Sequence, residues 1–312
     1  MKKRGIVCYA TEQGLGRQAK SYFDNGLAQE FLIVPHPEFE THTEWYPNAC
    51  KNFEELLGKV EEIWFLETPF DWSYIIRARK AGVRTVLFLM YECSRKPLPY
   101  YPDILVGGSI MERIHFGEDV KVINVPAPKE IQWKLRQKAL VFVHNAGHGG
   151  LGGRNGTKEI LEAIKWVKSP IQLIIRTQFD SFKSDDPRVD IRVGDFNYSE
   201  LFVEGDVFIY PDKFGGSCLP LQEAHSAGMM VMASDRIPSN TWLPKEALIP
   251  IKGYSKKVIG GAEFDCAIVD PKDIASQIDK FYNTDITKFS EAGKIWAEEN
   301  SWDSLKPIYE SI

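Results

Sequence analysis

Three glycine-rich turns contain the residues of this sequence that are best suited to bind an anion. They span residues 10–20, 144–159 and 211–219, and each follows a short apolar run. Glycine lets backbone N–H groups approach a ligand closely, and a helix that begins at the turn adds the positive end of its dipole. The second turn has six glycines between 147 and 156, among them Gly149 and Gly150, directly before a predicted helix. This pattern favours a phosphate-binding loop, with a flexible surface loop as the alternative.

The first turn reads ATEQGLGRQAK, in which Gly14, Gly16 and Ala19 fit the pattern G-x-G-x-x-A of dinucleotide-binding folds. Such folds also need an acid at the end of the second strand to bind a ribose. Residues 31–38 read FLIVPHPE instead and place Glu38 late, which disfavours a nicotinamide oxidoreductase. Two interpretations stay open: a tight turn that lets the next helix pack, and a turn whose amides approach a ligand.

Two arginines and one glutamate could complete a site at these turns. Arg154 lies in the second turn and Arg176 ends the apolar run 171–176, so either could supply positive charge or be an ordinary solvated cation. No G-K-[ST] closes the second turn, which is therefore not a P-loop. Glu223 lies one turn into a predicted helix, where its carboxylate could accept hydrogen bonds from the vicinal hydroxyls of a ribose. A glutamate at that place also complements the helix dipole.

Apolar runs that alternate with helical patterns must position these turns. Strands are predicted at 5–10, 31–34, 62–66, 85–90, 103–107, 139–143, 171–176, 189–193, 206–210, 229–233 and 247–251. Helices are predicted at 14–28, 52–60, 71–81, 157–168, with Thr157 as its N-cap, 198–204, 219–227 and 271–283. Alternation of this kind predicts parallel sheets with helices on both faces.

The 312 residues exceed what one compact core usually covers, so two α/β domains are expected. The proline-containing stretch near 126–137 separates two runs of the pattern. We expect a Rossmann-like domain over 1–126 and a second over 127–285. Residues 286–312 form a predicted helical tail, for which packing back on the first domain is one arrangement.

Composition excludes several classes of protein. A net charge of −5 gives no general attraction to nucleic acid or to anionic lipid. The five cysteines are scattered without a C-x-x-C pair, which suits a reducing cytoplasm and argues against disulfides or zinc. The longest apolar runs, such as 85–90, are far below the roughly 20 residues of a membrane helix, and no signal peptide is expected.

Residues 215–235 read GGSCLPLQEAHSAGMMVMASD. This stretch resembles the donor-binding motif of group 1 (family 4-like) glycosyltransferases of the GT-B fold, whose usual form is E-G-F-G-L-P-x-x-E-A-x-A-x-G-x-P-V-x-A-S-D. The resemblance extends to 139–163 and 193–207, about a third of the chain in total. It implies the GT-B architecture, with two Rossmann-like doubly wound domains that face across a cleft.

The resemblance implies transfer of a sugar from a nucleotide-sugar donor, such as a UDP-sugar, with retention and without a bound metal or other cofactor. Glu223 would hold the ribose, and Phe196, in the segment 194–196, would border the base. The backbone of the turn that contains Gly215, Gly216, Ser217 and Leu219 would face the sugar or the diphosphate. Arg154 falls in the family's R-K-G element.

Two departures from the family motif bear on turnover. The family's first glutamate is Gly215 here, and its lysine is Asn155. An active enzyme must compensate for these losses, and Arg176, Arg17 and Lys213 are the candidates, because a leaving diphosphate gains charge in the transition state. The alternative is a nucleotide-sugar-binding protein without turnover.

The first domain would bind the acceptor. Glu92 follows the strand 85–90, where many relatives have a histidine, and is the candidate for orienting an acceptor hydroxyl or stabilising charge on the sugar. A surface charge is the alternative, and His115, His144 and His148 are further candidates. A glycan, a protein, a small molecule or a modified DNA stay open as acceptors, and so does the oligomeric state. A groove for DNA would use Arg77, Arg79, Lys80, Arg84, Arg95 and Lys96.

Overall fold

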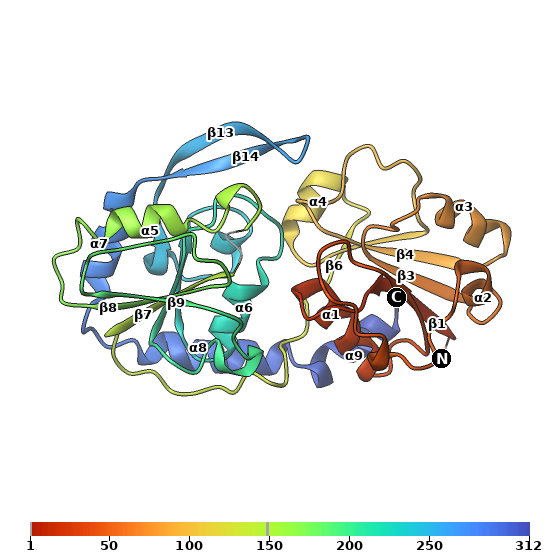
Figure 1. Cartoon of the computed structure of the whole chain (residues 1–312), viewed down its shortest axis with the longest axis horizontal. Coiled ribbons are helices and arrows are strands. Elements are labelled where there is room, and N and C mark those ends of the chain that lie inside the picture. The colour runs from red at the N-terminus through yellow and green to blue at the C-terminus, as the bar shows by residue number, and fades with distance from the viewer. Residues whose placement is uncertain (1, 148–149) are drawn as a thin grey trace. The chain divides into compact units, whose positions relative to one another are not determined.

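The computed structural model describes residues 2–147 and 150–312 (Figure 1). The chain forms two compact units. Unit 1 contains Met1–Val125 together with Trp302–Ile312, and unit 2 contains Pro126–Ser301. No helix of the described residues has both the length and the apolar character needed to cross a membrane.

Unit 1 is built on a six-stranded parallel sheet, of which the apolar runs predict five strands; the short strand β6 (Lys121–Val122) was not predicted. Its strands lie in the order β2-β1-β3-β4-β5-β6. They are β1 (Arg4–Tyr9), β2 (Glu30–Val34), β3 (Glu62–Glu67), β4 (Arg84–Leu89), β5 (Ile104–Gly107) and β6 (Lys121–Val122). The strands β1, β3 and β4 are almost fully buried, which explains their continuous apolar sequence.

Helices cover both faces of this sheet. They are α1 (Gly14–Asp24), α2 (Phe53–Leu57), α3 (Ser73–Lys80), α4 (Ile110–Phe116) and α9 (Trp302–Glu310), with a short 3-10 helix at Thr43–Trp45. Side chains of α1 and α9 share one apolar core with Trp64 and Phe88, whereas α2 and α3 pack into a second core on the opposite face. Helix α4 was not predicted. Its signal is the capping box formed by Ser109 and Glu112.

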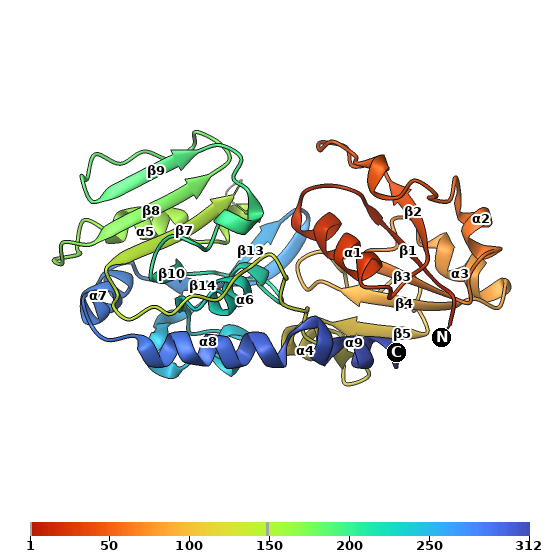
Figure 2. The same ribbon diagram turned by 90° about the horizontal axis from the view of Figure 1, so that it is seen from below.

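Unit 2 repeats the architecture with the strand order β12-β11-β10-β7-β8-β9. Figure 2 shows β9, β8 and β7 side by side at one side of this sheet. The strands are β7 (Val141–Gly147), β8 (Gln172–Thr177), β9 (Val189–Val193), β10 (Val207–Tyr210), β11 (Met230–Ser234) and β12 (Leu248–Ile249). Every pairing within this sheet is parallel, so its strands share one carboxyl edge.

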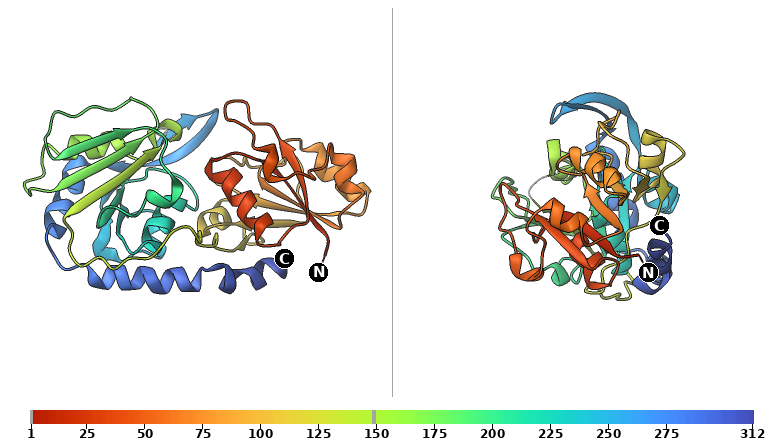
Figure 3. Two further views of the ribbon diagram at one scale, coloured as in Figure 1. Left: turned by 60° about the horizontal axis from the view of Figure 1, so that its bottom comes forward. Right: turned by 90° about the vertical axis from the view of Figure 1, so that its right-hand side faces the viewer.

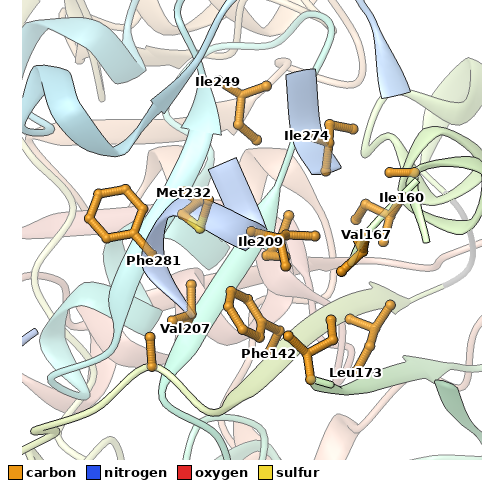
Figure 4. Close-up of a cluster of buried hydrophobic side chains, with 14 of the residues drawn as sticks. Phe142, Ile160, Val167, Leu173, Val207, Ile209, Met232, Ile249, Ile274 and Phe281 are labelled. Carbon is orange, nitrogen blue, oxygen red and sulfur yellow. The ribbon is translucent and has the colours of Figure 1, made fainter. Parts of the chain in front are cut away.

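The helices of unit 2 are α5 (Thr157–Ala163), α6 (Leu219–Ser226), α7 (Pro271–Phe281) and α8 (Thr287–Glu299). Short 3-10 helices lie at Leu151–Gly153, Tyr198–Glu200, Ser239–Thr241 and Lys245–Ala247. Side chains of α5 and α7 meet the sheet in the core of Figure 4, where Phe142, Ile209 and Ile274 lie close together. Of the predicted helix 198–204, only the 3-10 turn Tyr198–Glu200 forms.

A two-stranded antiparallel hairpin, β13 (Ile251–Ile259) and β14 (Ala262–Val269), stands apart from the sheet of unit 2. It is the light-blue ribbon at the top of Figure 1 and of the right view in Figure 3. The predicted strand 247–251 is wrong in its extent, because Pro250, which has no N–H to donate, separates β12 from β13. Gly260-Gly261, both with positive φ, is the hairpin signal in the sequence.

Helix α9 completes the core of unit 1. The hydroxyl of Tyr309 lies 3.1 Å from that of Tyr22 and donates a hydrogen bond to the carbonyl of Asn124 (2.9 Å). Arg4 donates to the carbonyl of Glu310 (2.9 Å). The last helix of the chain is therefore joined to β1, α1 and the end of the first segment.

A chain of buried polar groups joins β7, β10 and the start of α5 in unit 2. Nδ1 of His144 donates to the carbonyl of Ile209 (2.8 Å), and its Nε2 lies 2.8 Å from the hydroxyl of Thr157. Burial lowers the pKa of His144 to about 4, so the imidazole is neutral near pH 7. The N-cap of α5 is Gly156 rather than the predicted Thr157, whose hydroxyl is engaged by His144.

We expect Leu305→Ala to lower the free energy of unfolding of unit 1 by about 2–5 kcal/mol, because it leaves a cavity under α9. Leu305 is 7% exposed, and the matched control Ile308→Ala, on the same helix, removes a side chain that is 47% exposed. Hydrogen exchange of strand β3 would report the change. Equal protection in both variants would contradict the packing described for α9.

We expect the stability of unit 2 to depend on His144 in a narrow pH range. The folded pKa of about 4 lies below the ordinary 6.5, so between these values the unfolded chain binds the extra proton. The stabilisation is complete above pH 6.5 and decreases toward pH 4, by about 3 kcal/mol. Urea unfolding of wild type and His144→Gln at several pH values checks this. The two curves should converge on acidification, with a residual slope from His225, whose pKa burial also lowers to about 4.

Candidate functional site

The second and third glycine-rich turns leave neighbouring strands of unit 2. In doubly wound sheets, ligands bind beyond the carboxyl ends of the strands, at the point where the strand order reverses. In unit 2 this point lies between β7 and β10, because β8 and β9 continue on one side and β11 and β12 on the other. The two turns touch: a side chain at Gly156 would lie 2.5 Å from the carbonyl oxygen of Pro211.

The second turn depends on glycine for its backbone path. Gly147, Gly150, Gly152, Gly153 and Gly156 all have φ between 54° and 75°, a conformation that other residues adopt at a cost. A Cβ at Gly150 would lie 3.2 Å from the Cγ of Arg154, so the stem of this arginine lies against the turn. The predicted site residue Gly149, like His148, lies outside the described residues.

Asn155, which stands in place of the family's lysine, is a buried structural residue with 2% exposure. Its Nδ2 donates to the carbonyl of Ala146 (2.9 Å), and its Oδ1 lies 3.0 Å from the hydroxyl of Thr157. It therefore joins the end of the turn to strand β7 and to the polar chain of His144. A cation is not supplied at this position.

A buried ion pair supports the backbone of the third turn. Arg236 and Asp212 are each 2% exposed and form a salt bridge. Nη2 of Arg236 also donates to the carbonyl of Gly215 (2.7 Å), whose φ of 142° suits glycine. Lys213, which follows Asp212, donates its backbone N–H to the carbonyl of Arg154 (2.8 Å) in the second turn. Asp212 and Arg236 were not predicted from the sequence.

The third turn leads directly into helix α6. Cys218 precedes the helix with φ of 48°, Leu219 is its first residue, and Nε2 of Gln222 donates to the carbonyl of Ser217 (2.9 Å). Gly216 and Ser217 are buried within the turn. The predicted residues of this turn thus lie together at the amino end of α6, where the helix dipole is positive.

Glu223 and the segment predicted to border a base lie close together. The hydroxyl of Tyr198 donates to Oε1 of Glu223 (2.6 Å), which joins α6 to the stretch that follows β9. Phe196, half-buried, lies two residues before Tyr198. Tyr198 was missed from the sequence, and an aromatic residue in a polar turn is its weak signal.

The three cations proposed as compensation are all ion-paired. Nη2 of Arg176 lies 2.9 Å from Glu204, and the same side chain donates to the carbonyl of Leu201 (3.0 Å). Nζ of Lys213 lies 2.7 Å from Glu159 of α5. Arg17 of unit 1 pairs with Glu12. Arg176 is 5% exposed, and these contacts join the segment after β9 to the sheet, whereas its role in donor binding stays a prediction.

In unit 1 the strand order reverses between β1 and β3. A Cβ at Gly16 would lie 2.2 Å from the carbonyl oxygen of Thr11, so Gly16 is needed for the close packing of α1 on the first turn. Gly14 has open space around its Cα and is exposed. Glu67, the last residue of β3, and Phe70, which follows the strand, have positive φ (69° and 64°), an unusual conformation that often marks ligand sites.

Glu92 is buried at 7% exposure in the turn after β4, rather than on the surface. Nη1 of Arg95 donates to its carbonyl (3.0 Å). Burial, and to a lesser extent the charge of Glu92, raise the pKa of Glu112, which accepts from the hydroxyl (2.6 Å) and the backbone N–H (3.0 Å) of Ser109. Two carboxyl groups therefore lie near the ends of adjacent strands β4 and β5.

No group of three or more histidine, cysteine, aspartate or glutamate side chains in 2–147 and 150–312 could hold a metal ion. The expectation of a metal-free reaction stays a prediction.

Comparison with known proteins identifies the fold. No protein-family model and no curated protein matches the sequence. Among solved structures, HepE from Anabaena in complex with UDP and glucose is similar, with a TM-score of 0.69 and 13% identity over 99% of both chains. A glycosyltransferase from Rickettsia africae has a TM-score of 0.67 and 10% identity over 99% of this chain and 98% of its own.

The sucrose-phosphate synthase of Thermosynechococcus elongatus is a third similar structure, with a TM-score of 0.63 and 12% identity over 99% of both chains. The family 4-like assignment stays a prediction, because identities this low show the fold alone. The shared fold covers both Rossmann-like units and confirms the fold class predicted from the sequence. The chain has the GT-B fold of these glycosyltransferases.

Proposed function

We propose that this chain is a glycosyltransferase that moves a sugar from a nucleotide-sugar donor to an acceptor. One observation carries the proposal. Glu223, one turn into α6, accepts a hydrogen bond from Tyr198 in the segment after β9, next to the two glycine-rich turns that leave the sheet where its strand order reverses. HepE, which shares the fold, was crystallised with UDP and glucose. The donor nucleotide we favour first is therefore UDP.

Each part of the donor has a proposed partner. The ribose hydroxyls donate to the carboxylate of Glu223, and the base lies near Phe196. Backbone N–H groups at the amino end of α6 and in the second turn face the diphosphate, whose charge grows as the sugar leaves. Arg154, whose stem lies against Gly150, is the side-chain cation of the second turn. We propose retention and no metal ion, as the motif implies.

We place the acceptor at the carboxyl edge of the unit 1 sheet. There the ring of Tyr9 lies 4.6 Å from His36 and 4.8 Å from Phe70, between centroids, next to the left-handed turn after β3. Half-buried aromatic rings suit a neutral acceptor such as a glycan or a small molecule. Glu92 is the proposed group for an acceptor hydroxyl, and all five free thiols fit a reducing cytoplasm.

A DNA acceptor is disfavoured by the placement of the basic residues. The second half of α3 and the start of β4 lie at the amino edge of the sheet, opposite the carboxyl edge. Arg77 there pairs with Glu54, and Arg84 pairs with Glu62. Lys96, at the carboxyl edge, donates to the carbonyl of His115 (2.9 Å). The basic residues thus form no continuous groove for a polyanion.

The second candidate function is donor binding without turnover. It is favoured by one observation: Arg176, Lys213 and Arg17, the cations that could replace the missing family residues, are all paired with carboxylates. The two functions make the same prediction for donor binding and opposite predictions for release of the nucleoside diphosphate.

We expect the purified protein to release nucleoside diphosphate from one of UDP-, GDP- or ADP-glucose without added metal. Glu223→Ala should lower this release about 100-fold, because ribose loses its charged hydrogen-bond acceptor. Glu200→Ala, which removes an exposed carboxylate of the same unit, is the matched control and should change little. Binding without release, with acceptors present, would establish the second candidate instead; no binding of any donor would overturn both.

A further inference from the structure

The interaction between Arg236 and the third turn fixes the direction of one peptide group. Arg236 follows β11, which pairs with β10, so its side chain reaches the turn after β10. Its Nη2 donates to the carbonyl of Gly215 (2.7 Å), and its other terminal nitrogen pairs with Asp212. One guanidinium therefore connects a carboxylate and a carbonyl that lie three residues apart in the same turn.

The direction of the following amide group depends on this contact. The peptide bond between Gly215 and Gly216 is trans. In a planar trans peptide the C=O and the N–H point in opposite directions. Because the Gly215 carbonyl points to the buried guanidinium, the Gly216 N–H points away from it. A hydrogen bond from a charged donor also polarises the peptide group and strengthens its N–H as a donor.

We propose that Arg236 is a positioning residue of the donor site: it orients and polarises the Gly215–Gly216 peptide, so that the Gly216 N–H is directed at the anionic part of the donor. This inference rests on the proposed function. It also explains how the turn works without the family's glutamate. The turn binds through its backbone, and the charge that orients the Gly215–Gly216 peptide is on the buried guanidinium of Arg236. No charged side chain at position 215 is needed.

The burial of the pair supports this role. Two charges that leave water are costly, and a buried ion pair seldom stabilises a fold more than well-packed apolar residues do. Asp212 gains little here beyond Arg236, since its Oδ1 is buried and has no hydrogen-bond partner among the described residues. Phe214 in the same turn stacks on Phe264 of the hairpin, with centroids 4.8 Å apart, which keeps the surroundings apolar. In such surroundings the charge of Arg236 acts strongly on the peptide.

The test compares ligands with and without a diphosphate. Calorimetry would measure binding of UDP, GDP and ADP, each beside its own nucleoside, to wild type, Arg236→Lys and Arg236→Met. We expect both variants to lose affinity for the diphosphate that the wild type binds, by about 10-fold or more, while affinity for its nucleoside changes less than twofold. Lysine keeps the charge but lacks the planar pair of terminal nitrogens that meet Asp212 and the Gly215 carbonyl, so it should not rescue binding.

Arg188 offers a matched control in the same unit. It also joins an aspartate, Asp186 (2.7 Å), to a backbone carbonyl, that of Ile164 (2.7 Å), but at the amino side of β9. Arg188→Met should lower the unfolding temperature and leave the ratio of diphosphate to nucleoside affinity unchanged. If the Arg236 variants do not fold, Asp212→Asn, which keeps the size of the side chain, should produce the same split.

The outcomes separate the two proposals. If the wild type binds none of the three nucleoside diphosphates, the proposed function fails and this inference fails with it. If the wild type binds one of them and the folded variants at 236 or 212 keep its affinity relative to the nucleoside, the proposed function stands and the role of Arg236 is overturned. An equal loss of both affinities would show a purely structural pair and would also overturn it.

Discussion

The pairing of β7 with β10 is the constraint on which the candidate donor site depends. This ladder brings together two strands that are far apart in the sequence, with Val207 opposite Phe142. The glycine-rich turns lie next to each other because they follow the carboxyl ends of these paired parallel strands. Further contacts fix them in place. His144 joins β7 to β10 through the Ile209 carbonyl, and the Lys213 N–H joins the turns directly. If this ladder were shifted, the two turns would no longer lie next to each other.

The candidate site differs from the family motif in which groups can supply positive charge. The family's glutamate and lysine are absent, and their positions are taken by a glycine with positive φ and by a buried asparagine that donates to the backbone of strand β7. Arg176, Lys213 and Arg236 are paired with carboxylates, so the proposed sources of positive potential are Arg154 and the backbone dipoles of the turns. Such dipoles need rigid support, because a peptide group that rotates loses its orientation. The buried groups beneath the turns, Asp212, Arg236, Asn155 and His144, provide that support.

Much of the fold could be predicted because the strands of parallel sheets are continuous apolar runs, as in β3 and β10. The glycine turns and Glu223 could be found because local spacing carries their signal. Arg236 could not, because its partners lie 21 and 24 residues away and depend on the pairing of β10 with β11. The same holds for the partners of Arg176 and Lys213, since a lone cation in a sequence does not reveal which carboxylate it will meet. Gly16 was ambiguous until the position of Thr11 was known.

The division of the chain has a consequence for its biosynthesis. Residues of unit 2 are contiguous, whereas the core of unit 1 takes Trp302, Leu305 and Tyr309 from a helix that is translated after all of unit 2. During translation, one apolar face of the unit 1 sheet therefore lacks helix α9 until residues 126–301 have been synthesised. The order in which the units can finish folding is thus the reverse of the order in which they begin. During that interval Tyr22, Trp64 and Phe88 lack the apolar side chains of α9 with which they share the finished core.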